Sequence, residues 1–255
     1  MTNEQHPLYA IVLAAGEGSR LHPLTEQVPK PMLPIDGRAV VLRVLDQLAL
    51  VGVSDAAIVI GYLGQVLRDF LDERAQSPRL TFVEQPLQLG SAHALQCALD
   101  AGVPRVDTII VASDIAWSDA DVSRVVARAA ADSEALVTVA VQRWPVALVP
   151  HSLATIVDDQ QRVTKMLSRC IAEDQPADAT ALSGSAMYVF RAEFWQYVAA
   201  AVPSDHGKIE LATALQRAID DGHVVRAVEI DASRDLTRPV DLLRHNFPYL
   251  GDWLP

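Results

Sequence analysis

The chain has 255 residues, half of them hydrophobic and 21% charged, and its formal net charge is −11. This composition is sufficient for a substantial globular core. An acidic chain has no general attraction for a polyanion, which excludes a nucleic acid as the main partner. Any phosphate must therefore be bound locally, by a few cations and backbone N–H groups.

The cysteines and the hydropathy pattern predict the compartment. Cys97 and Cys170 have neither a paired spacing nor a histidine cluster nearby, so no disulfide or zinc site is expected. The opening "MTNEQHP" lacks the basic and apolar regions of a signal peptide. No apolar run approaches the length of a membrane span. We expect a reduced, cytoplasmic protein with no membrane partner.

In the first half, short β-branched runs alternate with segments of helical period. This alternation predicts βαβ units and a mostly parallel sheet. Strands are expected at 8–14, 56–62, 80–85 and 107–114, and helices at 39–52, 64–74, 91–102 and 119–131. Gly52 is expected to close the first of these helices.

The second half has a less regular pattern. Strands are expected at 135–141, 152–158, 162–167, 183–190 and 223–231, and helices at 191–202, 207–222 and 239–250. The second and third of these strands could pair as a hairpin across "DQQ". No repeat or low-complexity linker interrupts the chain. We therefore predict a single α/β domain over 1–255, with a Rossmann-like, mostly parallel sheet flanked by helices. Extra antiparallel strands would lie over the edge where ligands bind.

An irregular segment follows the first strand: 13–35, "LAAGEGSRLHPLTEQVPKPMLPI". Gly16 and Gly18 allow the backbone to turn sharply and approach a ligand, and successive N–H groups in such a turn can surround an anion. Arg20 offers a planar fork for phosphate oxygens, and Lys30, held between two prolines, offers a point charge. The segment predicts a phosphate site at the carboxyl edge of the sheet.

Two common phosphate motifs do not fit this segment. It is not G-x-x-x-x-G-K-[ST], and "GEGSRL" departs from G-x-G-x-x-G at its last position. The second expected strand also lacks the acidic residue that binds a ribose in dinucleotide-binding domains. A dehydrogenase-like domain is therefore disfavoured, and a G-x-G alone is most often only a turn with surface cations.

The whole segment is more specific than its glycines. It resembles the signature of nucleotidyltransferases acting on sugar 1-phosphates, L-A-A-G-x-G-[ST]-R-[LM]-x-P-L-T followed by P-K-P and a short apolar strand. That family includes glucose-1-phosphate thymidylyl- and uridylyltransferases and the uridylyltransferase domain of GlmU-type enzymes. The resemblance implies a nucleotide-diphospho-sugar transferase-like fold, with Arg20 at the triphosphate and Lys30 near the α-phosphate as catalytic residues. The implied nucleotide-binding residues here are Leu13, Ala14, Ala15, Gly16, Gly18 and Ser19.

A second match is "EQPLQLGSAHAL" at 84–95, which resembles the family segment Q…[LQ]G-[ST]-A-x-A. It implies that Gln85 meets the edge of the base, with Gly90 and Ser91 beside the base and ribose. Ser91 is also a good N-cap for the helix that follows, and the two roles are compatible. His93 is interpreted only as a residue on the face of that helix.

The implied cofactor is Mg²⁺, which prefers one or two carboxylates together with phosphate oxygens. Asp114 ends the fourth strand in "VASDI", where the family closes a strand with G-D, although aspartate there is also a common turn residue. "RDLTRPVDLLRHNFPYL" resembles D-[VI]-G-x-P-W-D-L-L-x-A-N-x-x-L-L and implies Asp235 as the second metal ligand. "EIDASRDL" resembles the E-I-D-T-x-E-D-L of cytidylyltransferase relatives and nominates Asp231 instead. Asp241 is expected to cap the last helix.

The acceptor side departs from the family. Where members usually carry Glu-Lys-Pro, this chain has Ser168, Arg169 and Cys170, so the glutamate is missing and a cation remains. "SGSAMYVF" stands in place of N-x-G-x-Y, and "GKIELATAL" keeps Glu210. The acceptor-binding candidates are Arg169, Ser185 and Glu210. We expect a nucleotide-binding half of about 1–115 and an acceptor-binding half of about 116–255.

The resemblance implies an enzyme that joins a nucleoside triphosphate to a phosphorylated acceptor and releases pyrophosphate. Gln85 and its context favour UTP or dTTP, with CTP as an alternative, and a sugar 1-phosphate is the expected acceptor. One alternative is a cytidylyltransferase for phosphocholine, a phosphonate or a cyclitol phosphate. Another is a non-catalytic nucleotide sensor, which the retention of Arg20 and Lys30 disfavours. The sequence leaves a homo-oligomer open.

Overall fold

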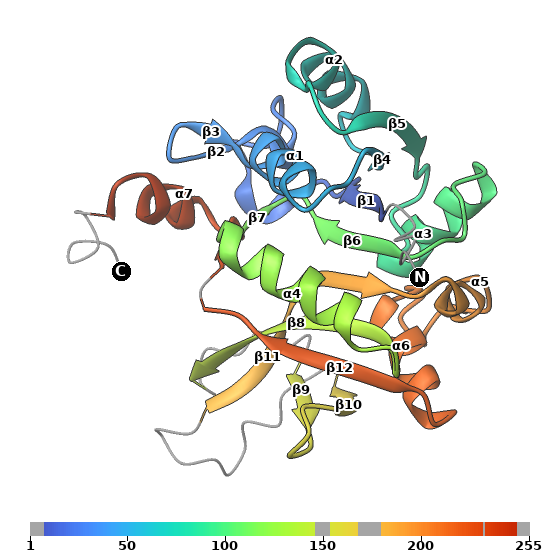
Figure 1. The fold of residues 1–255 in the computed structure, drawn as a ribbon. Helices are drawn as coiled ribbons and strands as arrows, with labels where there is room; N and C mark the ends of the chain where they lie inside the picture. The colour runs from blue at the N-terminus through green and yellow to red at the C-terminus, as the bar shows by residue number, and fades with distance from the viewer. Residues whose placement is uncertain (1–7, 146–153, 168–179, 232, 249–255) are drawn as a thin grey trace.

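The computed structural model describes residues 8–145, 154–167, 180–231 and 233–248 (Figure 1). Its main feature is a nine-stranded sheet with helices on both faces, which confirms the predicted fold class. The first-half strands are β1 (Tyr9–Ala14), β4 (Asp55–Ile60), β5 (Arg79–Glu84) and β6 (Thr108–Ala112). They pair in parallel, in the order β6-β1-β4-β5. The first-half helices are α1 (Val40–Leu50), α2 (Gly64–Arg74), α3 (Ser91–Asp100) and α4 (Asp119–Ala131).

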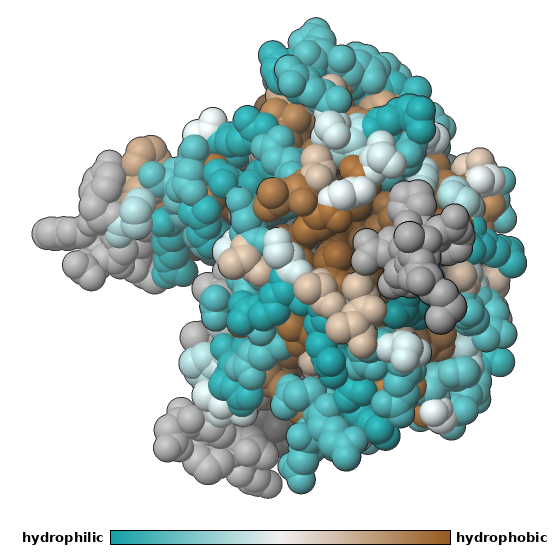
Figure 2. All heavy atoms as spheres, in the orientation of Figure 1, coloured by the Kyte–Doolittle hydropathy of each residue, from teal (hydrophilic) through white to brown (hydrophobic). Residues whose placement is uncertain are grey.

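The parallel strands are central because their side chains are apolar on both faces. Ala10, Ile11 and Val12 of β1 are fully buried. Alternation along the strand sends Ala10 and Val12 into a core with α1, α2 and α4, and Ile11 into the opposite core with α3. On the face shown in Figure 2, hydrophilic side chains cover α2, whose buried residues Leu67 and Leu71 turn towards the sheet. Gly52 ends α1 with a positive φ of 87°, as predicted.

The second half adds mainly antiparallel strands beyond β6. They are β8 (Ala135–Pro145), β9 (Ala154–Val157), β10 (Val163–Leu167), β11 (Thr180–Phe190) and β12 (Val224–Glu229). The last residues of β11 pair with β6, and its earlier residues run past the carboxyl end of β6 to pair with β8 and β9. β9 and β10 form the expected hairpin, whereas β12 is parallel to β8. The predicted residues 152–153 lie outside the described part.

The predicted helix boundaries hold less well here. The expected helix 191–202 is split into η4 (Ala192–Phe194) and the short α5 (Trp195–Ala199). The expected helix 207–222 begins only at Leu211, as α6 (Leu211–Asp220). The reason is that the backbone of Ile209 bonds to Leu89 and to the first turn of α3, and so cannot continue a helix. The last helix, α7 (Pro239–Asn246), begins as expected.

Candidate active site

The loop after β1 is fixed around Gly18. This residue has a left-handed backbone with φ of 67°, and a Cβ on it would lie 3.1–3.4 Å from the side-chain carbons of Lys30. Its carbonyl accepts bonds from Leu21 N at 2.8 Å and from the Thr25 hydroxyl at 2.9 Å. Leu21 closes the short helix η1 (Ser19–Leu21) as a fully buried anchor. Glycine is thus required both by the turn and by the close approach of Lys30.

Lys30 begins η2 (Lys30–Met32), and its alkyl chain lies under Gly18. Its ammonium group pairs with the carboxylate of Asp114, which follows β6. The side chains of Lys30 and Asp114 are 14% and 28% exposed, so the pair is largely enclosed but still reachable. Next to Asp114, Ser113 donates its hydroxyl to the carbonyl of Leu13 at 2.7 Å. This bond ties together the carboxyl ends of β1 and β6.

A segment from the far end of the sequence joins this edge. The short strands β7 (Ile115–Ala116) and β13 (Arg234–Asp235) pair, with Asp235 opposite Ile115. Leu236 N donates to the carbonyl of Asp114 at 3.1 Å. The half-buried Asp235 accepts a bond from the hydroxyl of Thr237 at 2.9 Å. The pairing of β7 with β13 therefore brings Asp235 beside Asp114.

The competing candidate lies elsewhere. The side chain of Asp231 is 80% exposed and pairs with Arg124 of α4 at 3.3 Å. Its backbone N–H donates to the buried Asp121, also on α4. Asp241 caps α7 as predicted, accepting from Thr237 N at 3.0 Å and Arg238 N at 2.6 Å.

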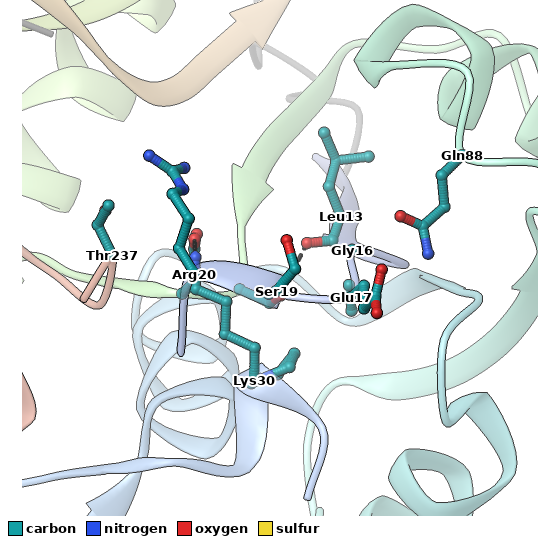
Figure 3. A pocket seen from close by; sticks show the side chains of 13 residues that line it. Leu13, Gly16, Glu17, Ser19, Arg20, Lys30, Gln88 and Thr237 are labelled. Atoms are coloured by element: carbon teal, nitrogen blue, oxygen red, sulfur yellow. Dashed lines mark hydrogen bonds and ion pairs between the residues drawn. The ribbon is translucent and has the colours of Figure 1, made fainter. Parts of the chain in front are cut away.

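The loop after β1, Lys30, Asp114 and Thr237 line a cavity of about 330 Å³ (Figure 3). Eight of the residues that the sequence nominated are in its wall: Leu13, Ala14, Gly16, Gly18, Ser19, Arg20, Lys30 and Asp114. Figure 3 shows Arg20 and Lys30 on one side of the cavity and Gln88 on the other. The exposed side chain of Arg20 extends into the open space. Backbone N–H groups and two cations in this arrangement can surround a polyanion.

The sequence reasoning missed five lining residues: Glu17, Pro31, Gln88, Ser113 and Thr237. Gln88 lay inside a matched segment, but a glutamine in a loop has no distinguishing chemistry. Thr237 depends on the pairing of β7 with β13, which no local pattern reveals. Of the five, Ser113 had the clearest sequence signal, because it stands next to Asp114 at the end of a strand.

The residues expected around the base lie next to this cavity rather than in its wall. Gln85 is 5% exposed, and its amide nitrogen lies 3.0 Å from the carbonyl oxygen of Gly90 and 3.0 Å from Nδ1 of His93. It lines a neighbouring cavity of about 400 Å³, and Gln88 belongs to both cavities. Ala15 is also outside the first wall, and its carbonyl accepts from Tyr62 N at 3.1 Å.

The prediction that Ser91 caps α3 is wrong. The helix begins at Ser91 itself, with Gly90 as the N-cap, and Gly90 has no side chain with which to cap. The Ser91 hydroxyl instead accepts a bond from Leu211 N at 3.0 Å, at the start of α6. A Cβ on Gly90 would lie 2.5 Å from the carbonyl oxygen of Ile209, so the position requires glycine. Tertiary contacts between α3 and α6 therefore determine this helix start.

The acceptor candidates do not meet in the 330 Å³ cavity. Ser185 on β11 is buried and accepts a bond from Trp117 Nε1 at 2.9 Å. Glu210 is exposed, just before α6. Arg169 lies outside the described residues, as do Ser168 and Cys170.

The carboxylates at this site suit a hard cation. Among the described residues there is no group of three or more His, Cys, Asp or Glu that could form a complete metal cage. Mg²⁺ does not need one, because it binds through one or two carboxylates plus substrate phosphates. Asp114 lines the cavity, and Asp235, which is paired with the neighbouring Ile115, is not among the lining residues. None of the described helices is both long enough and apolar enough to cross a membrane.

Fold and site together define an α/β protein with a cation-lined cavity at the carboxyl edge of its parallel sheet, where such folds bind their ligands. Residues 9–250 match the family model described as nucleotidyl transferase, and the chain therefore belongs to the nucleotidyl transferase family. The predicted family and enzyme class are confirmed.

Several characterised proteins are similar over most of the chain. The UTP–glucose-1-phosphate uridylyltransferase AglF of Haloferax volcanii is 28% identical over 236 residues, which cover 92% of this chain and 93% of AglF. The low-salt glycan biosynthesis nucleotidyltransferase Agl11 of the same organism is 27% identical, with 95% of this chain and 66% of that protein covered. The bifunctional protein GlmU of Methanococcus maripaludis is 26% identical, with 95% of this chain and 54% of that protein covered. The chain therefore spans about half the length of that protein.

Solved structures show the same fold. A UDP-glucose pyrophosphorylase complexed with UDP-glucose superposes with a TM-score of 0.80 at 17% identity, covering 97% of this chain and all of that one. The UTP-bound UGPase from Acinetobacter baumannii gives 0.77 at 20% identity, covering 96% and 94%. At these identities the likeness supports the fold and no finer property.

Proposed function

We propose that this protein joins UTP or dTTP to a sugar 1-phosphate, forming a nucleoside diphosphate sugar and pyrophosphate. The observation that carries the proposal is the 330 Å³ cavity, in which the glycine loop, Arg20, Lys30 and Asp114 converge. Its volume lies within the range of about 300–1,000 Å³ typical of small-molecule sites. The similarity to a UTP–glucose-1-phosphate uridylyltransferase over 92% of the chain supports the choice of substrates.

In this proposal the triphosphate lies along the loop. Gly16 and Gly18 let the backbone approach the phosphates, and the N–H groups of the loop donate to their oxygens. Arg20 has an exposed guanidinium, with no ion pair to another described residue, that can reach the terminal phosphates. Lys30 is held by Gly18 and Asp114, so its charge is positioned before substrate arrives.

The reaction is an in-line displacement at the α-phosphorus. A phosphate oxygen of the sugar 1-phosphate forms the new P–O bond, and the bond between the α-phosphorus and the bridging oxygen breaks. Pyrophosphate leaves with the electron pair of that bond. No protein base is required, because the attacking oxygen is already anionic. The protein has to bring two anions together and neutralise their charge, which is the role proposed for Lys30 and Arg20.

Mg²⁺ would be held by Asp114 and Asp235. When bound, it would supply positive charge to the phosphate oxygens. The proposal favours Asp235 over Asp231 because Asp235 lies beside Asp114, whereas Asp231 pairs with Arg124.

The base would extend past Gln88 towards the 400 Å³ cavity and Gln85, with Gly90 and Ser91 alongside. Arg169, Ser185 and Glu210 remain the candidates for the acceptor. The half-buried free thiol of Cys97 is compatible with a reducing cytoplasm, where we place the reaction.

The test is a grid of pyrophosphate-release assays. UTP, dTTP, CTP, ATP and GTP are each paired with glucose 1-phosphate, N-acetylglucosamine 1-phosphate and phosphocholine, with and without Mg²⁺. The Lys30→Ala variant serves as the inactive control. We expect turnover with UTP or dTTP and a sugar 1-phosphate. Turnover only with CTP and phosphocholine would overturn the substrate choice. Nucleotide binding without pyrophosphate release from any pair would indicate a sensor.

A further inference from the structure

The side-chain amide of Gln85 has a defined orientation. Its nitrogen Nε2 lies 3.0 Å from the carbonyl oxygen of Gly90 and 3.0 Å from Nδ1 of His93. A backbone carbonyl can only accept a hydrogen bond, so the atom that faces Gly90 must be the NH₂ group. The second N–H of that group then points at His93, whose Nδ1 must be the unprotonated, accepting nitrogen of the ring. Both donors of Gln85 are therefore used inside the protein.

The two acceptors are themselves held in place. Gly90 has φ of 119°, and its carbonyl also accepts from Ala94 N at 3.2 Å. The N–H of His93 donates to the carbonyl of Ile209 at 3.3 Å, and a Cβ on Gly90 would lie 2.5 Å from the same oxygen. Gly90 is the N-cap of α3 and His93 lies in its first turn, and both acceptors are 3.0 Å from the same nitrogen. They form a rigid clamp on the NH₂ group.

The His93 ring also has a thiol beside it. Cys97 Sγ, one turn further along α3, lies 3.8 Å from Nε2 and 4.0 Å from Nδ1 of His93. Burial raises the pKa of the Cys97 thiol, and the nearby carboxylate of Asp100 raises it further. The ring therefore has an uncharged thiol as its neighbour.

The orientation of the amide determines what Gln85 offers to a ligand. With the NH₂ group clamped, the carbonyl oxygen Oε1 is the remaining polar atom, and it can only accept. Gln85 lines the 400 Å³ cavity next to the phosphate site. Uracil and thymine carry an N3–H donor at the pairing edge, whereas N3 of cytosine is an acceptor. An acceptor on the protein thus matches uracil or thymine at this position and opposes the lone pair of cytosine.

We propose that His93 is a positioning residue that, together with Gly90, fixes the Gln85 amide so that its oxygen faces the base and selects UTP or dTTP over CTP. This inference rests on the proposed function, because it requires Gln85 to meet the base. The inference goes beyond the proposed function by naming the residue that sets the preference for UTP or dTTP. Without an acceptor at position 93, only the Gly90 carbonyl holds the NH₂ group, so the amide is less firmly oriented and its preference for an N3–H donor weakens.

The measurement is the ratio of kcat/KM for UTP to that for CTP. We expect His93→Leu to lower this ratio about tenfold, the effect of one hydrogen bond gained or lost. His93→Asn should restore most of it, since its Oδ1 can accept where Nδ1 does. The matched control is His223→Leu, the same substitution at a histidine that packs against Tyr197 before β12, and it should leave the ratio unchanged. If His93→Leu does not fold, His93→Phe removes the acceptor and keeps a ring.

The Gln85→Leu variant distinguishes a failure of this inference from a failure of the proposed base site. If that variant keeps the wild-type ratio, Gln85 does not read the base and the proposed base site is wrong. If Gln85→Leu lowers the ratio but the folded His93→Leu does not, the positioning role of His93 is wrong and the base site stands. If His93→Leu lowers kcat/KM equally for UTP and CTP, His93 has a purely structural role, and this result would also overturn the inference.

Discussion

The two halves of this chain each contain an enclosed ion pair, and the two pairs have different surroundings. In the first half, Lys30 and Asp114 are 14% and 28% exposed and line the 330 Å³ cavity. In the second half, Arg226 and Asp132 are each 7% exposed and line neither the 330 Å³ nor the 400 Å³ cavity. Arg226 also bonds to the carbonyl of Gln160, joining β12 to the turn before β10. The first pair is available to a ligand, and the second holds strands together.

The same contrast holds for the candidate site residues. Those of the first half mostly follow parallel strands, whose carboxyl ends meet at one edge, so their convergence follows from the topology. In the second half the strands run in both directions, and a residue reaches the site only through a particular pairing. Thr237 reaches it, and Asp235 comes next to it, through the pairing of β13 with β7, whereas Ser185 lies under Trp117. In the proposed function the first half thus carries the phosphate chemistry, and the second mainly supports it.

Asp132→Asn should have the largest effect, and it should act on stability. Breaking one partner of a buried ion pair costs about 3–5 kcal/mol, a factor of more than a hundred in the unfolding equilibrium. Asp132 Oδ2 lies 2.6 Å from Arg226 Nε and 3.1 Å from Arg128 Nη2, so the variant leaves two cations without this carboxylate. Urea unfolding should show the loss, while kcat per folded molecule stays close to wild type. A large fall in kcat of the folded variant would contradict the contrast between the pairs.

The pH dependence gives a second measurement on this variant. Burial opposes ionisation of Asp132, but the hydrogen bond and charge of Arg226 outweigh it and hold the pKa of Asp132 below its ordinary value of 3.8. A lowered pKa contributes stability above the unfolded value, and that stability is lost as the pH falls through the folded value. The stability gap between wild type and Asp132→Asn should therefore narrow below about pH 4. A gap that stays constant under acid conditions would show that the carboxylate charge contributes nothing.

Lys30→Ala and Arg20→Ala should each lower kcat by about 10²–10³, the effect of removing one group that stabilises a transition-state anion. Stability should change little for Arg20, whose side chain is exposed. Pyrophosphate release at saturating substrate is the measurement. The control is Lys165→Ala, an exposed lysine on β10. Turnover within threefold of wild type in either variant would remove that residue from the mechanism.

Asp235→Asn and Asp231→Asn form a matched pair that decides between the two alignments of the C-terminal segment. We expect Asp235→Asn to lose Mg²⁺-dependent turnover by about a hundredfold or more, because a ligand that neutralises phosphate charge is removed. Asp231→Asn should stay within twofold of wild type, because its partner Arg124 lies on the surface of α4. Initial rates over a Mg²⁺ titration measure both. The opposite result would assign the metal to Asp231.

Gln88→Ala tests the passage between the two cavities. Gln88 lines both, and Figure 3 shows its side chain directed into the phosphate cavity. We expect KM for the nucleotide to rise about tenfold with little change in kcat, because Gln88 would contact the nucleotide away from the reacting bond. Leu87→Ala in the same loop is exposed and lines neither cavity, and it serves as the control. Equal KM values in the two variants would argue that Gln88 does not touch the nucleotide.

Much of the first half could be predicted from its pattern. Apolar runs and helical periods place β1, β4, β5 and β6 within one or two residues of the structure, and the glycines and cations of 13–35 indicate the phosphate site. What could not be predicted depends on contacts between distant segments. Ser91 cannot cap α3 because its hydroxyl bonds to Leu211, and α6 starts late because Ile209 bonds to α3. Gln88 and Thr237 enter the site only once their loops are folded.

Ala186→Gly has the smallest expected effect and tests why the second half departs from regular strand geometry. Ala186 has φ of 47°, where the register of β11 against β8 shifts between Gly184 and Tyr188. A left-handed backbone costs an L-residue about 1–2 kcal/mol, and glycine removes that cost but adds entropy to the unfolded chain. We therefore expect a net stabilisation of up to about 1 kcal/mol in urea unfolding.

The control for this variant is Ala181→Gly, in the regular part of the same strand, which should destabilise by about 0.5–1 kcal/mol. If both substitutions destabilise equally, the bulge carries no strain. If only Ala186→Gly stabilises, the strand is strained where it passes the carboxyl end of β6, because Met187 is already paired with Val111. Strain kept beside a catalytic edge is characteristic of a functional constraint. That outcome would direct the search for the acceptor site to this bend of β11.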